Sequence, residues 1–282
     1  MTAPHPLPGF VGLPLRTPTL PPARHTNCYI VGHHDALVVD PGSAYPAELR
    51  RLKEALWDLR GTGGNVTAVF LTHHHRDHVG GAGALAQHLG VPVAAHGETH
   101  ERLALPAGVA RVEVHQGQTF TTDPGHVVEA MWTPGHAPGH LCLFERRSRT
   151  LVAGDMITGI GTTVIDPPDG QMAVFLRSLR RLAALDPTTI LPAHGPSLDE
   201  GQRRIESLID HRLRREARVL AALRDGPRDL MTITRVAYAE IPARVWPLAS
   251  RSGLAHLIKL QDEGRAQPIG DDRWAMVEES SP

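Results

Sequence analysis

The sequence predicts an α/β protein built from two packed mixed sheets flanked by helices, followed by a small, mainly α-helical module. Three observations predict this fold. Strand and helix patterns alternate over residues 27–95. Strand patterns then follow one another without helices over residues 109–150, and a further helix and strand come after them. Two sheets packed together and covered by helices accommodate that order, because each sheet and each helix must bury an apolar face.

The first half of the chain alternates short apolar runs with helical spacing. Strands are predicted where apolar runs end at turn residues, as at Asp40-Pro41-Gly42. A helix is predicted where leucines recur every three or four residues, as over residues 46–59. The expected strands are 28–31, 36–39, 66–71 and 91–95, and the expected helices are 46–59 and 82–89.

The second half begins with strands and ends with helices. Strands are expected at 112–114, 127–132, 141–144, 151–153 and 189–191, with a helix at 172–185. A long helix then begins near Asp199 and ends at Gly226-Pro227. One face of this helix is apolar and the other carries arginines, namely Arg203, Arg204, Arg212, Arg214, Arg215 and Arg218. Helices at 232–240 and 245–263 and a hairpin at 265–269 and 273–277 complete a winged-helix-like module.

These patterns divide the chain into three parts. Residues 1–25 are rich in proline and are expected to form an extended arm on the surface. Residues 26–205 form the larger α/β domain, and residues 206–282 form the winged-helix-like domain.

The composition disfavours several classes of protein. The net charge of −1 gives no general attraction to nucleic acid or to an anionic membrane. No apolar run approaches the ~20 residues of a membrane span, and the N-terminus lacks a secretory signal, so we expect a cytoplasmic protein with no membrane partner. Cys28 and Cys142 are too few and too far apart for a disulfide framework or a thiolate site. The 18 histidines favour a metal site, because histidine is the commonest metal ligand.

The strongest motif is His73-x-His75-x-Asp77-His78, which follows a predicted buried strand and precedes two glycines. Four ligand-type side chains in six residues cannot all face one way on a strand or a helix. They can converge if the strand breaks into a loop, which the glycines permit. Imidazole and carboxylate together suit zinc, iron or manganese. The absence of nearby cysteine favours a catalytic site with an open position over a closed structural site.

Three further ligand-type residues stand at predicted strand ends. They are His136, Asp155 and His194. Each follows an apolar run and is bracketed by glycine or proline. Because strand ends in layered α/β folds point into a common cleft, we expect these side chains to meet the motif there.

The ordered set of motifs from Thr26 to Gly195 resembles the metallo-β-lactamase superfamily. Within it the chain is most similar to the lactamase-β-2-like group, which joins an αββα hydrolase domain to a C-terminal winged-helix-like domain. Residues 154–163 and the arginine-rich helix after Gly195 carry this closer similarity. The resemblance implies a hydrolase domain at residues 26–205.

The resemblance also implies a dinuclear metal centre with two Zn²⁺ per chain, iron or manganese being alternatives. The first metal would be held by His73, His75 and His136, the second by Asp77, His78 and His194, and Asp155 would bridge the two. Asp40 matches a position that helps to hold the ligand loop, and residues of this kind orient the imidazoles.

A mechanism follows from this ligand set. Two zinc ions about 3.5–4 Å apart can share a bridging hydroxide, because zinc lowers the pKa of water to about 7. We expect Asp77 and Asp155 to be the catalytic carboxylates, with Asp77 orienting the hydroxide. His74 is expected to point away from the metals. His140 could contact substrate or form a structural hydrogen bond, and Thr162 and Thr163 are expected at the mouth of the cleft.

The substrate stays open at this stage. The resemblance allows cleavage of the phosphodiester bonds of single-stranded RNA, which the arginine face would track. That face could instead be solvated or paired with Glu206, Asp210 and Glu216. The resemblance equally allows hydrolysis of a small-molecule acyl thioester or ester. A mononuclear iron oxidoreductase similar to the persulfide dioxygenases is the alternative from another class. The sequence leaves homodimer formation undecided.

Overall fold

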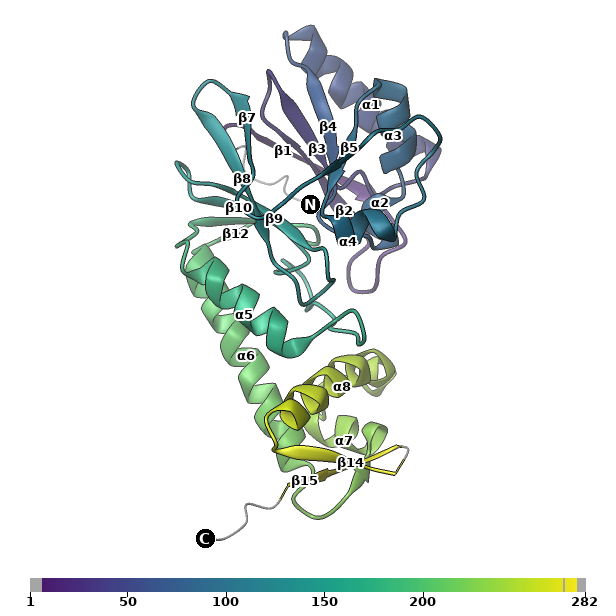
Figure 1. Cartoon of the computed structure of the whole chain (residues 1–282), viewed down its shortest axis with the longest axis vertical. Coiled ribbons are helices and arrows are strands. Elements are labelled where there is room, and N and C mark those ends of the chain that lie inside the picture. Colours follow the sequence, from purple (N-terminus) through teal and green to yellow (C-terminus); the bar gives the residue numbers. More distant parts are fainter. Residues whose placement is uncertain (1–6, 271, 278–282) are drawn as a thin grey trace.

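A computed structural model describes residues 7–270 and 272–277 of the chain. Two six-stranded sheets form the larger part of these residues (Figure 1). The first sheet consists, in spatial order, of β1 (Phe10–Arg16), β2 (His25–Val31), β3 (Ala36–Val39), β4 (Val66–Phe70), β5 (Val93–Ala95) and β6 (Arg111–Glu113). The second consists of β12 (Leu198–Asp199), β11 (Thr189–Pro192), β10 (Thr150–Gly154), β9 (Leu141–Glu145), β8 (His126–Trp132) and β7 (Thr119–Asp123).

Both sheets are mixed. In the first, β1, β2 and β3 pair antiparallel, whereas β3, β4, β5 and β6 pair parallel. In the second, β10 and β11 are parallel and the other neighbours are antiparallel. The facing sides of the two sheets share one apolar core, to which β4 contributes Phe70 and β9 contributes Leu143.

Helices cover the outer faces of both sheets (Figure 1). They are α1 (Pro46–Gly61), α2 (Arg76–Val79), α3 (Ala82–Leu89) and α4 (Gly97–Glu101) near the first sheet, and α5 (Met172–Ala183) and α6 (Gly201–Ala221) near the second. Leu56 of α1 and Leu85 of α3 pack on the first sheet, and Phe175 of α5 packs on the second. The predicted fold class of two mixed sheets flanked by helices is confirmed.

The C-terminal domain has its own core. Beyond α6 lie β13 (Arg228–Asp229), α7 (Leu230–Ala237), a 3₁₀ turn (Ala243–Val245), α8 (Trp246–Asp262), β14 (Ala266–Ile269) and β15 (Arg273–Met276). The core joins Val219 of α6, Ile233 of α7 and Leu257 of α8. Strand β15 pairs with both β13 and β14, so the predicted hairpin is present and gains a third strand. The predicted winged-helix-like fold is confirmed, although residues 271 and 278–282 lie outside the described residues.

The long helix α6 belongs to both domains. Its Ile205 lies in the core of the second sheet, and its Val219 lies in the C-terminal core. The predicted domain boundary between residues 205 and 206 therefore falls inside a continuous helix. The division into 26–205 and 206–282 stays a prediction.

Part of the predicted surface arm is a strand. Strand β1 pairs with β2 along its whole length, and its Phe10 and Leu15 are buried. Proline and glycine in this segment obscure the strand pattern, but an edge strand tolerates proline because one side of it forms no ladder bonds. Residues 1–6 of the arm lie outside the described residues. None of the helices that the structure describes is long and apolar enough to cross a membrane.

Candidate metal centre

The histidine-rich motif follows the carboxyl end of β4. The chain leaves β4 at Phe70, and α2 begins at Arg76 with His75 directly before it. The predicted loop is thus in part a single helical turn. Because a helix turns by about 100° per residue, neighbouring Asp77 and His78 can approach one centre, whereas an extended chain would send them to opposite faces.

Glycines let this turn pack against the loop that follows β3. A Cβ on Gly42 would lie 1.8 Å from the carbonyl oxygen of Asp77. A Cβ on Gly81 would lie 2.5 Å from the carbonyl oxygen of Ser43. Any side chain at either position would push the turn away, so close approach of two backbones explains these glycines.

The three isolated ligand-type residues arrive from the second sheet. His136 follows β8, Asp155 directly follows β10, and His194 lies two residues after β11. Strands β10 and β11 are parallel neighbours. Their carboxyl ends therefore lie side by side at one edge of the sheet, which brings Asp155 and His194 together.

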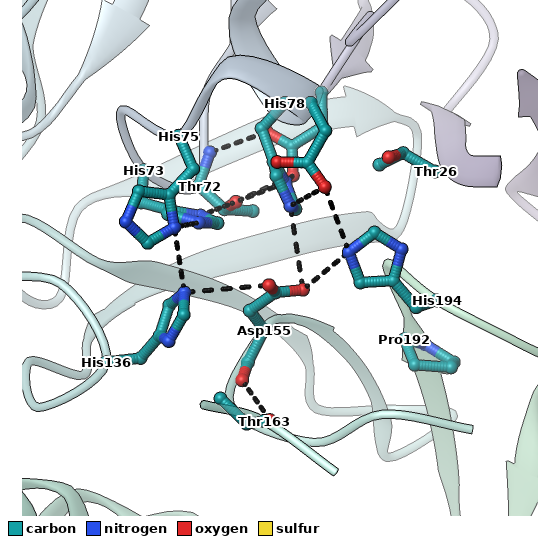
Figure 2. A network of polar contacts seen from close by, with 12 residues as sticks. Thr26, Thr72, His73, His75, His78, His136, Asp155, Thr163, Pro192 and His194 are labelled. Carbon is teal, nitrogen blue, oxygen red and sulfur yellow. Dashed lines mark hydrogen bonds and ion pairs between the residues drawn. The ribbon is translucent and has the colours of Figure 1, made fainter. Parts of the chain in front are cut away.

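A first donor group consists of three imidazoles. The Nε2 atom of His73 lies 2.9 Å from Nδ1 of His75, and Nε2 of His136 lies 3.0 Å from the same Nδ1 (Figure 2). A tetrahedral zinc ion with metal–nitrogen distances of about 2.0–2.1 Å would hold its nitrogen ligands about 3.3 Å apart. These three nitrogens need to move apart only slightly to hold such an ion.

A second donor group consists of Asp77, His78 and His194. The Nε2 atom of His194 lies 3.4 Å from Oδ2 of Asp77, and Nε2 of His78 lies 4.0 Å from that oxygen. One carboxylate and two imidazoles thus face a common point.

Asp155 lies between the two groups, with one oxygen toward each (Figure 2). Its Oδ2 is 3.5 Å from Nε2 of His136 in the first group. Its Oδ1 is 3.5 Å from Nε2 of His78 and 3.3 Å from Nε2 of His194 in the second. Oδ1 of Asp155 and Nε2 of His78 are buried and have no hydrogen-bond partner among the described residues. Both atoms face the second group, so a cation held there would satisfy them.

Backbone carbonyls set the tautomers of two imidazoles. Nδ1 of His136 donates to the carbonyl of Val164 at 2.9 Å, and Nδ1 of His194 donates to the carbonyl of His25 at 3.0 Å. Since a carbonyl only accepts, each Nδ1 carries the hydrogen. The Nε2 atoms of both rings therefore present lone pairs to the centre.

Asp40 sets the tautomers of two further imidazoles, those of His78 and His73. Its Oδ2 accepts from Nδ1 of His78 at 2.8 Å and from the hydroxyl of Thr72 at 2.6 Å. That hydroxyl then accepts from Nδ1 of His73 at 3.0 Å. The Nε2 atoms of His73 and His78 are thus free to bind a metal, and the donor set fits two transition-metal ions.

The electrostatics of the two groups differ. Burial, with help from the neighbouring His75, lowers the pKa of His136 to about 4, although Asp155 opposes this shift. Burial also disfavours a charged His194, but the carboxylates of Asp155 and Asp77 outweigh it and raise the pKa of His194 to about 10. The first group therefore consists of neutral imidazoles. The second concentrates negative charge that needs a proton or a cation beside it.

Residues next to the centre have supporting contacts. Nε2 of His74 lies 3.3 Å from Oδ2 of Asp169, outside both donor groups. His140 is fully buried, and its Nε2 accepts the backbone N–H of Asp155 at 3.1 Å, so its contacts are structural. The hydroxyl of Thr163 donates to the carbonyl of Asp155 at 2.8 Å.

A cavity of about 450 Å³ opens over both donor groups. Residues 18–23 of the arm form one wall, and residues 158–169 form another. Leu248 and Arg251 of α8 also line it, so both domains enclose the site. Thr162 and Thr163 line this cavity, in agreement with their expected place. No pattern in the sequence assigns residues 18–23 to the site, because their role depends on where β1 and β2 lie.

Two arginines on the basic face of α6, Arg212 and Arg215, are buried. Arg212 donates to the carbonyl of Thr163 at 2.6 Å, and Arg215 contacts Glu240 and lies 4.0 Å over the ring of Tyr238. The alternative of a solvated face therefore does not hold for this pair. The sequence did carry a signal, because both continue the apolar stripe of α6 at helical spacing. The stripe reads Ile205, Leu208, Arg212, Arg215 and Val219.

Comparisons with known proteins agree with this architecture. Residues 21–194 match a family described as the metallo-beta-lactamase superfamily, and residues 230–274 match the beta-lactamase associated winged helix domain. A beta-lactamase-like protein 2 homolog of Drosophila melanogaster is 30% identical over 270 residues, covering 91% of this chain and 89% of that protein. An atrochrysone carboxyl ACP thioesterase of Pseudocercospora fijiensis is 31% identical over 199 residues, covering 70% and 56% of the two chains. The crystal structure of a metallo-beta-lactamase family protein from Thermus thermophilus is 26% identical, covers 96% of this chain and 99% of that chain, and superposes with a TM-score of 0.79.

Proposed function

Because the chain belongs to the metallo-beta-lactamase superfamily, we propose that it is a hydrolase that holds two divalent metal ions, zinc in the simplest case, and cleaves acyl thioesters. The observation that carries the proposal is the position of Asp155, whose two oxygens face two different donor groups. A carboxylate placed in this way can bridge two ions. A single ion would leave one of the two donor groups without a cation.

The metal ions would lower the pKa of water and stabilise the negative charge that develops on the carbonyl oxygen under attack. The residues of the chain hold and orient the reactants. Asp155 fixes the separation of the two donor groups. Asp77 lies beside His194 at the edge of the cavity, where its carboxylate can accept a hydrogen bond from the attacking water. Hydrolysis of the thioester then yields a carboxylate and a thiol.

The shape and charge of the cavity support a small acyl substrate over RNA. Its walls include Leu20, Pro22 and Ile160, and its volume of about 450 Å³ lies in the usual range of small-molecule sites. Its two arginines, Arg76 and Arg251, are outnumbered by the carboxylates around it, and Arg251 pairs with Asp166. A strand of RNA would need a more basic groove. The thioesterase name of the Pseudocercospora fijiensis relative agrees with this choice.

Metal analysis and a substrate panel test the proposal. The purified protein should contain about two zinc ions per chain and hydrolyse acyl thioesters. A chelator should abolish this activity and added zinc should restore it. Asp155→Ala should be inactive, whereas His74→Ala, whose side chain lies outside both donor groups, should keep its metals and its activity.

Two results would overturn the proposal. Cleavage of single-stranded RNA that depends on Asp155, without turnover of any thioester, would assign the site to phosphodiester hydrolysis. One iron per chain together with oxidation of a persulfide would assign it to the oxidoreductase alternative.

A further inference from the structure

A second cavity of about 670 Å³ lies between α6, residues 157–164 and the C-terminal helices. It adjoins the cavity over the donor groups, and the two share lining residues from the arm, Pro21 and Pro22, and from residues 158–164. A ligand that reaches from one cavity into the other would place one end at the metal centre. We call this second space the α6 arginine cavity.

The charged residues that line the α6 arginine cavity are all basic. They are Arg204, Arg212, Arg214 and Arg215, accompanied by His211. No Asp or Glu of the described residues lines it. All five come from α6 and recur at helical spacing, so one face of the helix concentrates positive charge over the cavity. The cavity over the donor groups, in contrast, is lined by several carboxylates.

Most of this charge lacks a carboxylate partner. Arg215 pairs with Glu240, but Arg204, Arg212 and Arg214 form no ion pair within the described residues. The sequence had suggested pairing with Glu216, yet that carboxylate binds Lys259 at 2.7 Å instead.

Arg212 is the most unusual of the three because only 3% of it is exposed. Its contacts are neutral: the hydroxyl of Thr162 at 3.0 Å, the carbonyl of Thr163 at 2.6 Å and the ring of Phe175 at 5.5 Å. Its Nε has no hydrogen-bond partner within the described residues. Burial lowers the pKa of Arg212 to about 10, so the guanidinium remains charged at neutral pH. A buried charge without a counter-charge is costly, and an anionic ligand in the adjoining space would offset that cost.

We propose that the α6 arginine cavity binds a phosphate group on the thiol portion of the substrate, so that the enzyme acts on acyl thioesters of phosphorylated thiols. The planar guanidinium forks of several arginines match the oxygens of a phosphate and bind it in bidentate fashion. The acyl carbonyl would lie over the donor groups, and the phosphate would lie in the adjoining space. This inference rests on the proposed thioesterase function.

Direct binding tests the phosphate site without any turnover. Calorimetry on the metal-loaded enzyme compares 4′-phosphopantetheine with pantetheine, which differ only in the phosphate. The phosphorylated thiol should bind about 10- to 100-fold more tightly, as expected for one or two charged hydrogen bonds. Arg204→Gln and Arg214→Gln should remove most of this preference. Both side chains are exposed, so the fold should tolerate the change.

The matched control is Arg203→Gln. Arg203 is also exposed on α6, but it pairs with Glu200 and does not line the cavity. This variant should keep the preference for the phosphorylated thiol. Equal binding of the two thiols to the wild type, or the same loss in the control as in Arg204→Gln, would overturn the phosphate site.

Turnover separates this proposal from the proposed function. Acyl-phosphopantetheine should show a lower KM than the matching acyl-pantetheine, and Arg214→Gln should remove this difference in KM. If both thioesters turn over with equal KM, the thioesterase function stands and the phosphate site fails. If neither turns over, the thioesterase function fails. Binding of single-stranded RNA that depends on Arg204 and Arg214, with no binding of phosphopantetheine, would replace the phosphorylated thiol by a nucleic acid.

Discussion

Replacing Asp40 by alanine should destabilise the protein and weaken its affinity for metal ions, although Asp40 belongs to neither donor group. The carboxylate is only 2% exposed and accepts three hydrogen bonds, from the backbone N–H and the hydroxyl of Thr72 and from Nδ1 of His78. Its removal leaves three buried donors without an acceptor, at about 1–3 kcal/mol each. The substitution also removes the cost of burying the Asp40 carboxylate away from water, which offsets part of that sum. We therefore expect the free energy of unfolding to fall by about 3–5 kcal/mol.

The loss of metal affinity should be separate from the loss of stability. Without Asp40, His78 and His73 lose the contacts that direct their Nε2 atoms to the centre. Loss of a residue that orients metal ligands typically lowers metal affinity by about 10- to 100-fold, and we expect a loss of that size here. Asp40→Asn should show a smaller loss, because it keeps one acceptor oxygen.

Two measurements and one control decide the outcome. Urea denaturation in the presence of a chelator gives the stability, and competition with a chromophoric chelator gives the affinity. Asp186→Ala is the control, because Asp186 also has a left-handed backbone, with φ 53° against 49° for Asp40, but makes an exposed ion pair with Arg149. It carries the same backbone penalty, about 1 kcal/mol, and should bind metal normally. Wild-type affinity in Asp40→Ala would refute the role of Asp40 in orienting the imidazoles.

The other predictions concern the bridging carboxylate, its buried neighbour and the C-terminal domain. Asp155→Ala should lose activity together with at least one metal per chain, measured by elemental analysis; full metal content in this variant would exclude a bridging role. His140→Ala should leave the backbone N–H of Asp155 without an acceptor and lower metal affinity, again by about 10- to 100-fold, while circular dichroism stays unchanged. Glu216→Gln should destabilise the C-terminal domain at neutral pH. Burial raises the pKa of Glu216, but His256 and Lys259 outweigh it and hold that pKa below its usual value. The stabilisation is therefore complete above the unfolded pKa of about 4.3 and is lost as the pH falls through the lower folded value. The difference in urea midpoint between wild type and Glu216→Gln should accordingly shrink below about pH 4, and a constant difference would contradict this assignment.

The arrangement of strands and helices was largely predictable because the relevant signals are local. The apolar runs that became β3, β4 and β10 are short and bounded by turn residues, and leucine spacing marked α1. The segment that became β1 was missed. Its strand pattern is interrupted by proline and glycine, and only pairing with β2 stabilises it.

The ligand-type residues could also be identified from the local sequence, because the residue type carries the imidazole or carboxylate chemistry and each residue follows an apolar run. Their mutual geometry was not local. The hydrogen bond that sets the tautomer of His194 joins it to His25, 169 positions away in the chain. The parallel pairing of β10 with β11 brings Asp155 beside His194, and no periodicity in either strand specifies that pairing.

The sequence by itself thus determined the fold class, the position of each ligand-type side chain at a strand end, and the family resemblance. The tertiary structure alone decided which ring nitrogen faces the centre, how Asp155 lies between the two donor groups, and that Arg212 and Arg215 are buried. The physical reason is that secondary structure and ligand chemistry depend on neighbouring residues, whereas orientation, burial and charge balance depend on contacts between segments that are distant in the chain.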